Sequence, residues 1–435
     1  MKKFTMLVSL FCVCAFLAFG AGSKETPQQV VKEAGPITLT ILTTATTQNP
    51  EGPLAQEFFD EFMRLNPEIK LEVTGVPMNQ ALTKITTLAA AGSLPDVFVN
   101  TENIIGQLYD MGICEDLTPY MTKAELENIT ESVRIGSTME NKLVLYPWYS
   151  GPNALIFRKD WLEEKGISAP KTLEEMRLAA KALTADTNKD SLVDRWGFGM
   201  IGTNDDSGQT RFVMILRGFG AKELYFQDGT WKTDIGSPAS VEAFKYFTNL
   251  KNVDNVVPAG ALENSFNENV NLLAAEQIGM LIAGSNSVGK IFSANPGLKG
   301  KIGSVIVPSG VTSYTPSSIL GWSVNPSSKH KEAAVKFVKF VSSKKNAIKW
   351  VEVTGRIPCT NDAISDSEYL NTPLFEGFVA GFKAMEQAPN APYYAEVKNV
   401  LGRTYQKLIL NPALDATKEV QAAGREIQKI IDNNK

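Results

Sequence analysis

The chain has 435 residues, is 43% hydrophobic and carries a formal charge of −4 at pH 7. This length exceeds what one hydrophobic core usually supports, so we expect two lobes. The mildly acidic balance argues against nucleic acid as a partner. Beyond residue 20 the only cysteines are Cys114 and Cys359, which excludes a framework of several disulfides.

Residues 1–20 have the pattern of a cleavable signal peptide: two lysines, an apolar run and then small residues, with cleavage expected after Gly20 or Ala21. The apolar run is short for a membrane span. Removing the two lysines leaves 41 basic and 47 acidic residues, a net charge of −6. The polar residues 21–36 are predicted to form a flexible linker.

A lipid-anchored protein would carry a cysteine directly after the small residues of its signal. Cys12 and Cys14 instead lie inside the apolar run, after Phe11 and Val13. We therefore expect a soluble protein exported to a periplasm, and a lipid anchor is the alternative.

From Ile37 the chain alternates strand and helix. Strands are expected over 37–44, 69–73 and 95–99, and helices over 51–67 and 80–92. This alternation is typical of a doubly wound α/β fold, in which ligands bind beyond the carboxyl ends of the strands. The side chains expected at those ends are Thr44, Asn100 and Glu102.

A second α/β region follows. One strand runs into Pro147, a turn intervenes, and a new strand over 154–157 leads to a helix that ends at Gly166. Later strands are expected to end at Gly284 and at Pro308. The pattern indicates that the chain crosses from one lobe to the other near Pro147.

Trp322 stands between a glycine and a short apolar run, just before an Asn-Pro turn. The helix after the turn has its apolar residues on one face, at Ala333, Ala334, Phe337, Val338 and Val341. Taken alone, a tryptophan in this position is typical of a core, because large aromatic side chains dominate buried area.

Five segments carry a family resemblance in the same order along the chain: "AAAGSLPDVFV", "YPWYSGPNALIFRKDWLEEKGISAPKTLEEM", "EQIGMLIAGS", "GWSVNPSSKHKEAAVKFVKFVSS" and "TGRIP". Together they resemble the extracellular solute-binding proteins of sugar ABC importers, the group that includes the maltose-binding protein. The resemblance runs from Ile37 to the C-terminus, and the ordered set is more specific than any one motif.

The resemblance implies an α/β periplasmic-binding-protein fold with a ligand cleft between two lobes. Hinge segments are then expected near 146–149, 305–308 and 354–358. The implied lobes comprise residues 37–147 plus 308–355, and residues 148–307 plus 356–435.

The resemblance also places Trp322 on the cleft face of the first lobe, where an aromatic ring stacks on the apolar face of a sugar. Trp148 and Tyr149 lie at the first crossing, where they either contact the ligand or pack the hinge.

Ser285 and Asn286 lie where many relatives carry a tryptophan. The asparagine removes one stacking platform, which predicts a smaller or more polar ligand, or an aromatic supplied from elsewhere, such as Tyr394. Arg356 binds either an acidic group of the ligand or a carboxylate of the protein.

A possible calcium loop has oxygen ligands at Asp186, Asn188, Asp190, Leu192 and Asp194. A serine replaces the glycine of its sixth position, and a glycine stands where the bidentate glutamate belongs. The alternative is a turn rich in Asp and Asn, and no other cofactor is expected.

Catalysis finds little support, because the only histidine, His330, is expected to be exposed beside two lysines. The expected function is capture of a sugar or oligosaccharide by hinge closure, and its delivery by a monomeric protein to the permease of an ABC transporter. The alternatives are a binding protein for a peptide, polyamine or glycerol phosphodiester, and a secreted glycoside hydrolase with carboxylates such as Glu102 and Glu268.

Overall fold

The computed structural model describes residues 36–47 and 49–434. The predicted signal peptide, and all of the predicted linker except residue 36, lie outside these residues. Within the described ranges, none of the helices combines the length and the apolar character needed to cross a membrane.

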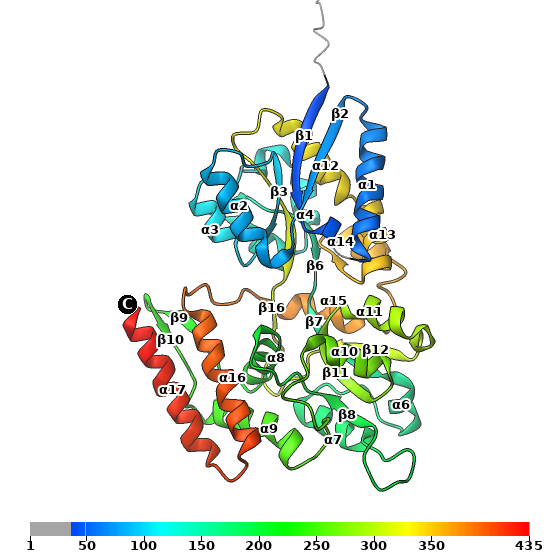
Figure 1. Ribbon diagram of the computed structural model, residues 1–435, viewed down its shortest axis with the longest axis vertical. Helices are drawn as coiled ribbons and strands as arrows, with labels where there is room; N and C mark the ends of the chain where they lie inside the picture. Colours follow the sequence, from blue (N-terminus) through cyan, green and yellow to red (C-terminus); the bar gives the residue numbers. More distant parts are fainter. Residues whose placement is uncertain (1–35, 48, 435) are drawn as a thin grey trace, which may run out of the picture. The chain divides into compact units, whose positions relative to one another are not determined.

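The first lobe is built on a six-stranded mixed sheet (Figure 1). In spatial order the strands are β15 (Ile357–Pro358), β6 (Tyr146–Ser150), β14 (Ile319–Val324), β3 (Val97–Thr101), β1 (Ile37–Thr43) and β2 (Ile69–Gly75). Strand β1 pairs in parallel with β2 and β3, and β14 pairs antiparallel with β3 and β6. The three strands expected from alternation are therefore confirmed and lie side by side.

Helices cover both faces of this sheet, with α1, α12 and α13 on one side and α2 and α3 on the other (Figure 1). The helices of the first lobe are α1 (Glu51–Leu65), α2 (Ala81–Ala90), α3 (Ile105–Asp110), α4 (Lys123–Asn128), α5 (Glu131–Gly136), α12 (Lys331–Val341), α13 (Lys344–Thr354) and α14 (Asn361–Asp366). The apolar faces predicted for α1 and α12 are buried, because the 3.6-residue period places those side chains toward the sheet.

The second lobe contains a four-stranded sheet in the order β12 (Ile302–Ile306), β7 (Asn153–Arg158), β11 (Ile278–Gly284) and β8 (Trp196–Gly199). Strand β7 is antiparallel to both neighbours, and β11 is parallel to β8. Its helices are α6 (Lys159–Glu164), α7 (Leu173–Leu183), α8 (Asp206–Gly218), α9 (Pro238–Asn252), α10 (Phe266–Ala274), α11 (Ser287–Ala294), α15 (Glu376–Gly381), α16 (Tyr394–Leu410) and α17 (Ala416–Asn433).

Three short strand pairs lie outside the two larger sheets. They are β4 (Thr138–Met139) with β5 (Lys142–Leu143), β9 (Tyr225–Gln227) with β10 (Thr230–Lys232), and β13 (Thr315–Pro316) with β16 (Met385–Glu386). Helices α4, α7 and α10 each begin with a capping box, in which a Ser or Thr and a Glu three residues later satisfy the free backbone N–H groups.

The first sheet extends further into the crossing segments than the sequence predicts. Residues 148–150 belong to β6, and 357–358 form β15, both in the first sheet. Helix α14 also contacts α13 and β15. The predicted lobe boundaries after residues 147 and 355 therefore fall too early, because no local residue pattern marks the point at which a crossing strand leaves its sheet.

Candidate functional site

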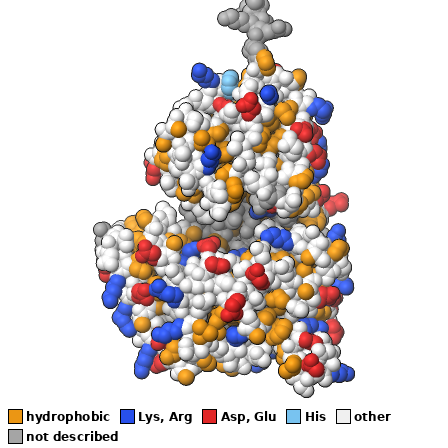
Figure 2. Space-filling model, viewed as in Figure 1, with side chains coloured by type: hydrophobic (Ala, Val, Ile, Leu, Met, Phe, Trp, Pro, Cys, Tyr) orange, Lys and Arg blue, Asp and Glu red, His pale blue; other side chains and the backbone are white. Residues whose placement is uncertain are grey.

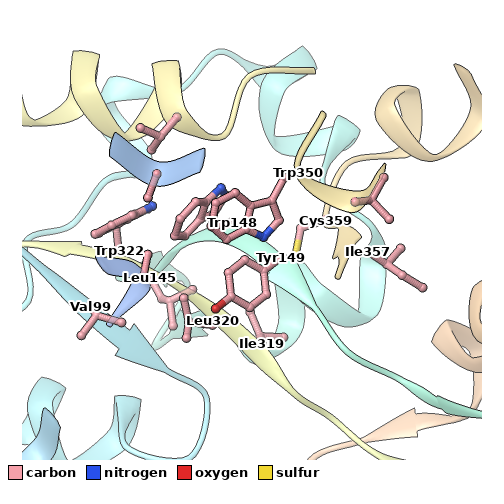
Figure 3. Close-up of a cluster of buried hydrophobic side chains, with 14 of the residues drawn as sticks. Val99, Leu145, Trp148, Tyr149, Ile319, Leu320, Trp322, Trp350, Ile357 and Cys359 are labelled. Carbon is pink, nitrogen blue, oxygen red and sulfur yellow. The ribbon is translucent and has the colours of Figure 1, made fainter. Parts of the chain in front are cut away.

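Trp322 is a core residue, and its predicted role as a stacking platform in the cleft is wrong. Its side chain is 0% exposed. Its ring lies 5.0 Å from that of Trp148 and 5.7 Å from that of Phe337 in α12, measured between ring centroids. Figure 3 shows Trp322 within this buried cluster. The side chain lies on the face of β14 that α12 covers, so it cannot reach a ligand on the other side.

The two aromatic residues of the first crossing also belong largely to this cluster (Figure 3). Trp148 is 2% exposed, and its ring centroid lies 4.3 Å from that of Trp350. The ring of Tyr149 stacks on Trp350 at 5.8 Å with an interplanar angle of 19°. For Trp148 the packing alternative therefore holds, whereas Tyr149 also borders the cavity described next.

A cavity of about 210 Å³ opens where β3 ends and β14 begins, beside the crossing strand β6. Figure 2 shows the surface of the molecule with its side chains coloured by type. The cavity is lined by Met78, Thr101, Glu102, Asn103, Tyr149, Gly151, Ser317, Ser318, Ile319, Leu320 and Arg356. Three residues predicted from the sequence, Glu102, Tyr149 and Arg356, thus meet at one place.

Glu102 is the most unusual residue of this cavity. Its side chain is 4% exposed, and neither carboxylate oxygen has a hydrogen-bond partner among the described residues. Burial raises the pKa of Glu102. The hydroxyl of Ser317, also on the cavity wall, has no hydrogen-bond partner within 3.5 Å either, although it lies near enough to Glu102 to offset part of the rise in the pKa of that carboxyl. Buried polar atoms are normally paired, so these atoms are available to a ligand.

Arg356 is held by the protein itself. Its Nε donates a hydrogen bond of 3.1 Å to Oε1 of Glu51, and its guanidinium lies 4.8 Å from the centre of the Tyr149 ring. Burial works against the charge, but Tyr149 and Glu51 outweigh it and raise the pKa of Arg356. Of the two predicted alternatives, the ion pair within the protein is the one that the structure contains.

Comparison with known proteins identifies the family of the chain. The model of the bacterial extracellular solute-binding protein family matches residues 45–348, more than half of the chain. The chain belongs to this family. Its resemblance to sugar ABC solute-binding proteins, inferred from the ordered segments, is thereby confirmed.

Relatives of this solute-binding protein include two with stated ligands. It is 22% identical to the maltotriose-binding protein of Pyrococcus abyssi over 82% of this chain and 74% of that protein. It is 22% identical to the maltodextrin-binding protein MdxE of Bacillus subtilis over 97% and 95% of the two chains. The maltose-bound MalE3 of T. maritima superimposes with a TM-score of 0.74, at 21% identity, over 91% of this chain and 100% of that one, which shows a shared two-lobed fold.

Other residues predicted to line the cleft of the solute-binding protein are buried or hydrogen-bonded within the protein. Asn100 is 0% exposed and donates a hydrogen bond of 2.9 Å to Ser323, so its predicted ligand contact is wrong. Thr44 is buried at the end of β1. The Tyr394 hydroxyl donates a hydrogen bond of 2.9 Å to Glu223, and burial together with Glu223 raises the pKa of Tyr394.

Ser285 and Asn286 lie between β11 and α11, at the carboxyl end of a strand as predicted, and Asn286 is the N-cap of α11. Ser285 is 0% exposed, and its hydroxyl has no partner among the described residues. Asn286 is partly exposed. Neither side chain lines the 210 Å³ cavity, so their contact with a ligand stays a prediction.

Sequence reasoning missed three residues of the second lobe: Arg211 in α8, Phe266 at the start of α10 and Lys290 in α11. The cationic groups of Arg211 and Lys290 lie 5.4 and 5.1 Å from the centre of the Phe266 ring. Asn153, at the first crossing, accepts a hydrogen bond of 3.3 Å from Arg211. No local pattern could have found this group, because its members come from helices far apart in the sequence.

The oxygens of the predicted calcium loop are occupied by the loop itself. Asp186 accepts hydrogen bonds from the backbone of Lys189 and Ser191, and Asp194 accepts them from Thr187. Within the described ranges, no group of three or more His, Cys, Asp or Glu residues is arranged to hold a metal ion. Calcium binding at this loop stays a prediction.

Glu102 and Glu268, the carboxylates named for the hydrolase alternative, do not come together, and neither His330 nor Cys359 lines the cavity. Glu268 is exposed and accepts a hydrogen bond of 3.0 Å from the backbone of Ser265 as the helix cap of α10. His330 lies at the start of α12, in the first lobe. Cys359 is buried, and burial raises the pKa of its thiol. Of the nominated carboxylates only Glu102 lines the cavity.

Proposed function

We propose that this solute-binding protein captures a saccharide in the cavity beside Glu102 and delivers it to an ABC transporter. The observation that carries the proposal is the pair of unpartnered polar groups in the cavity, the Glu102 carboxylate and the Ser317 hydroxyl. A sugar hydroxyl both donates and accepts, so it satisfies both groups at once. The maltotriose- and maltodextrin-binding relatives support a sugar as the ligand.

The cavity has room for only part of an oligosaccharide. Its volume of about 210 Å³ lies below the range of roughly 300–1,000 Å³ that is usual for small-molecule sites. The remainder of the ligand would therefore lie against the second lobe. A ligand that contacts both lobes stabilises their closed arrangement by its differential affinity for it.

The hinge proposed for this closure includes Gly355, between α13 and β15. Its φ is +72°, and a Cβ there would lie 2.7 Å from the carbonyl oxygen of Ser285 in the second lobe. A glycine tolerates both the left-handed backbone and the close approach. The permease would recognise the closed arrangement, which the ligand favours.

The same proposal covers the cellular setting. The signal-peptide pattern and the family support export, and we infer a soluble monomer in a periplasm rather than a lipid-anchored one. We also infer that the protein binds its ligand without cleaving it, since neither Glu268 nor His330 lies beside Glu102. Incubation with oligosaccharides should release no product.

The test is a thermal-shift and calorimetric screen of the mature protein against neutral mono- and oligosaccharides, amino acids and polyamines. A ligand at 100 times its dissociation constant adds about 2.7 kcal/mol of stability, which raises the melting temperature measurably. Glu102→Gln should lower the affinity for the saccharide that binds. Glu127→Gln, at an exposed position on α4, should leave that affinity unchanged. Binding only of amino acids or polyamines, or cleavage of an oligosaccharide, would overturn the proposal.

A further inference from the structure

One buried carboxylate of the described residues has no counter-charge. Of the acidic residues that the structure describes, three are buried: Glu51, Glu102 and Glu223. Glu51 forms an ion pair with Arg356 at 3.1 Å, and Glu223 forms one with Arg217 at 2.8 Å. Glu102 is 4% exposed, yet neither of its carboxylate oxygens has a hydrogen-bond or ion-pair partner among the described residues. Glu102 is therefore the exception among these buried carboxylates.

A fourth carboxylate follows the rule that Glu102 breaks. The side chain of Asp254 is 1% exposed, and it pairs with Arg177 at 2.6 Å and with Lys181 at 3.2 Å. Removing an ionised carboxylate from water is costly unless a cation or several hydrogen bonds accompany it. The described residues meet this requirement for Asp254, as for the two paired glutamates, and leave it unmet at Glu102.

The fold fixes Glu102 between helix α5 and the cavity. Glu102 follows the last residue of β3, and its backbone N–H donates a hydrogen bond of 3.2 Å to the carbonyl oxygen of Ile319 in β14. A Cβ added to Gly136, the last residue of α5, would lie 3.1 Å from Oε1 of Glu102, so this helix packs against the carboxylate. Glu102 also lines the cavity, which is the side from which a ligand can approach.

The other charge on the cavity wall is already balanced. The charged residues among those that line the cavity are Glu102 and Arg356, and Arg356 pairs with Glu51. Burial raises the pKa of Glu102, and the nearby Ser317 hydroxyl and the backbone of Ile319 offset only part of this rise. With Glu102 ionised, the wall therefore carries one uncompensated negative charge.

A ligand amine fits this charge better than a hydroxyl group does. A hydroxyl donates one hydrogen bond and leaves the carboxylate without a counter-charge, whereas an ammonium group has three donors and a full positive charge. The remaining polar side chains of the wall are neutral and suit the hydroxyl groups of a sugar. They are Thr101, Asn103, Ser317 and Ser318.

We propose that the ligand is an amino sugar, or an oligosaccharide that contains one, whose ammonium group binds the carboxylate of Glu102 in this cavity. This inference rests on the proposed function and names the substrate class. An amine and a hydroxyl group on neighbouring ring carbons engage Glu102 and Ser317 together, because these two side chains lie near each other on the cavity wall.

The experiment is isothermal titration of the mature protein with sugars that differ only in the group on carbon 2. These are glucosamine, N-acetylglucosamine and glucose, and the same three forms of galactose, as single sugars and as dimers, with spermidine as an amine that is not a sugar. The amino sugar should bind at least about tenfold more tightly than either neutral form, because a charge-assisted hydrogen bond is roughly twice as strong as a neutral one. This preference should shrink as salt is raised, and as pH rises past the pKa of the sugar amine.

Three variants separate the charge from the other contacts. Glu102→Gln keeps the shape of the side chain and removes its charge, so it should abolish the preference for the amino sugar. Ser317→Ala should weaken the amino and neutral forms alike, because both contact the hydroxyl of Ser317. Glu127→Gln, at an exposed position on α4, should change neither affinity nor preference.

The outcomes are distinct. Equal or tighter binding of the neutral sugars overturns this inference and leaves the proposed function standing, and so does a preference for the amine that survives Glu102→Gln. Binding of spermidine without any saccharide, or no binding at all, overturns both. If Glu102→Gln fails to fold, the comparison of amino and neutral sugars on the wild type, with its dependence on salt and pH, decides the question alone.

Discussion

Replacing Trp322 by alanine separates a core role from a ligand-binding role. The ring is fully buried against Trp148 and Phe337. A buried tryptophan removes roughly 150–250 Å² from water, which at about 25 cal/mol per Å² corresponds to ~4–6 kcal/mol. Measured truncations of this kind cost about 3–5 kcal/mol. We therefore expect Trp322→Ala to lower the free energy of unfolding by about 4 kcal/mol.

The assay is equilibrium unfolding of the mature protein in urea, followed by circular dichroism. Because the chain has two lobes, the transition of the first lobe is the one expected to shift. Trp231→Ala, on the β9–β10 hairpin and only half-buried, is the matched control and should cost about 1 kcal/mol. Trp322→Phe should fall between Trp322→Ala and the wild type, since it keeps most of the ring.

The reasoning is refuted if Trp322→Ala unfolds within about 1 kcal/mol of the wild type and loses its ligand affinity. That result would place the ring at the ligand and not in the core. A destabilised variant that still binds its ligand at low temperature would agree with the structure.

Three further substitutions follow from single contacts. Burial raises the pKa of Glu102, so the folded state binds the proton of this carboxyl more tightly than the unfolded state. The wild type therefore loses stability as pH rises from the ordinary carboxyl pKa to the raised value. In thermal melts, Glu102→Gln should be more stable than the wild type above that pH window and should lose this advantage below it. Arg217→Met removes the ion pair at 2.8 Å of Glu223, whose side chain is 0% exposed. The free energy of unfolding in urea should fall by about 3–5 kcal/mol, because the buried carboxylate loses its partner. An unchanged unfolding midpoint would contradict this. Gly321→Ala should disrupt the pairing of β14 with β6, because a Cβ would lie 2.1 Å from the carbonyl oxygen of Tyr146. A normal yield of folded protein with an unchanged melting temperature would show instead that the two strands can move apart freely.

The sequence predicted the elements of the fold well, because their signals are local. Alternation gave the strands that became β1, β2 and β3, and the 3.6-residue period gave the buried faces of α1 and α12. The rule that ligands bind beyond strand ends led to Glu102, which does line the cavity. The same rule also nominated Asn100, two residues earlier and still within β3, whose side chain is fully buried.

By itself, therefore, the sequence determined the α/β class and the family, and it predicted the end of the strands at which the cavity lies. Only the tertiary structure decided which way each side chain points. Trp322 is a core residue because α12 covers its face of β14, and no residue near Trp322 in the sequence indicates which face the helix covers. Arg211, Phe266 and Lys290 form a group only because α8, α10 and α11 pack together. Periodicity reports what a residue's neighbours in the chain require, whereas a binding site depends on contacts between residues that the chain keeps far apart.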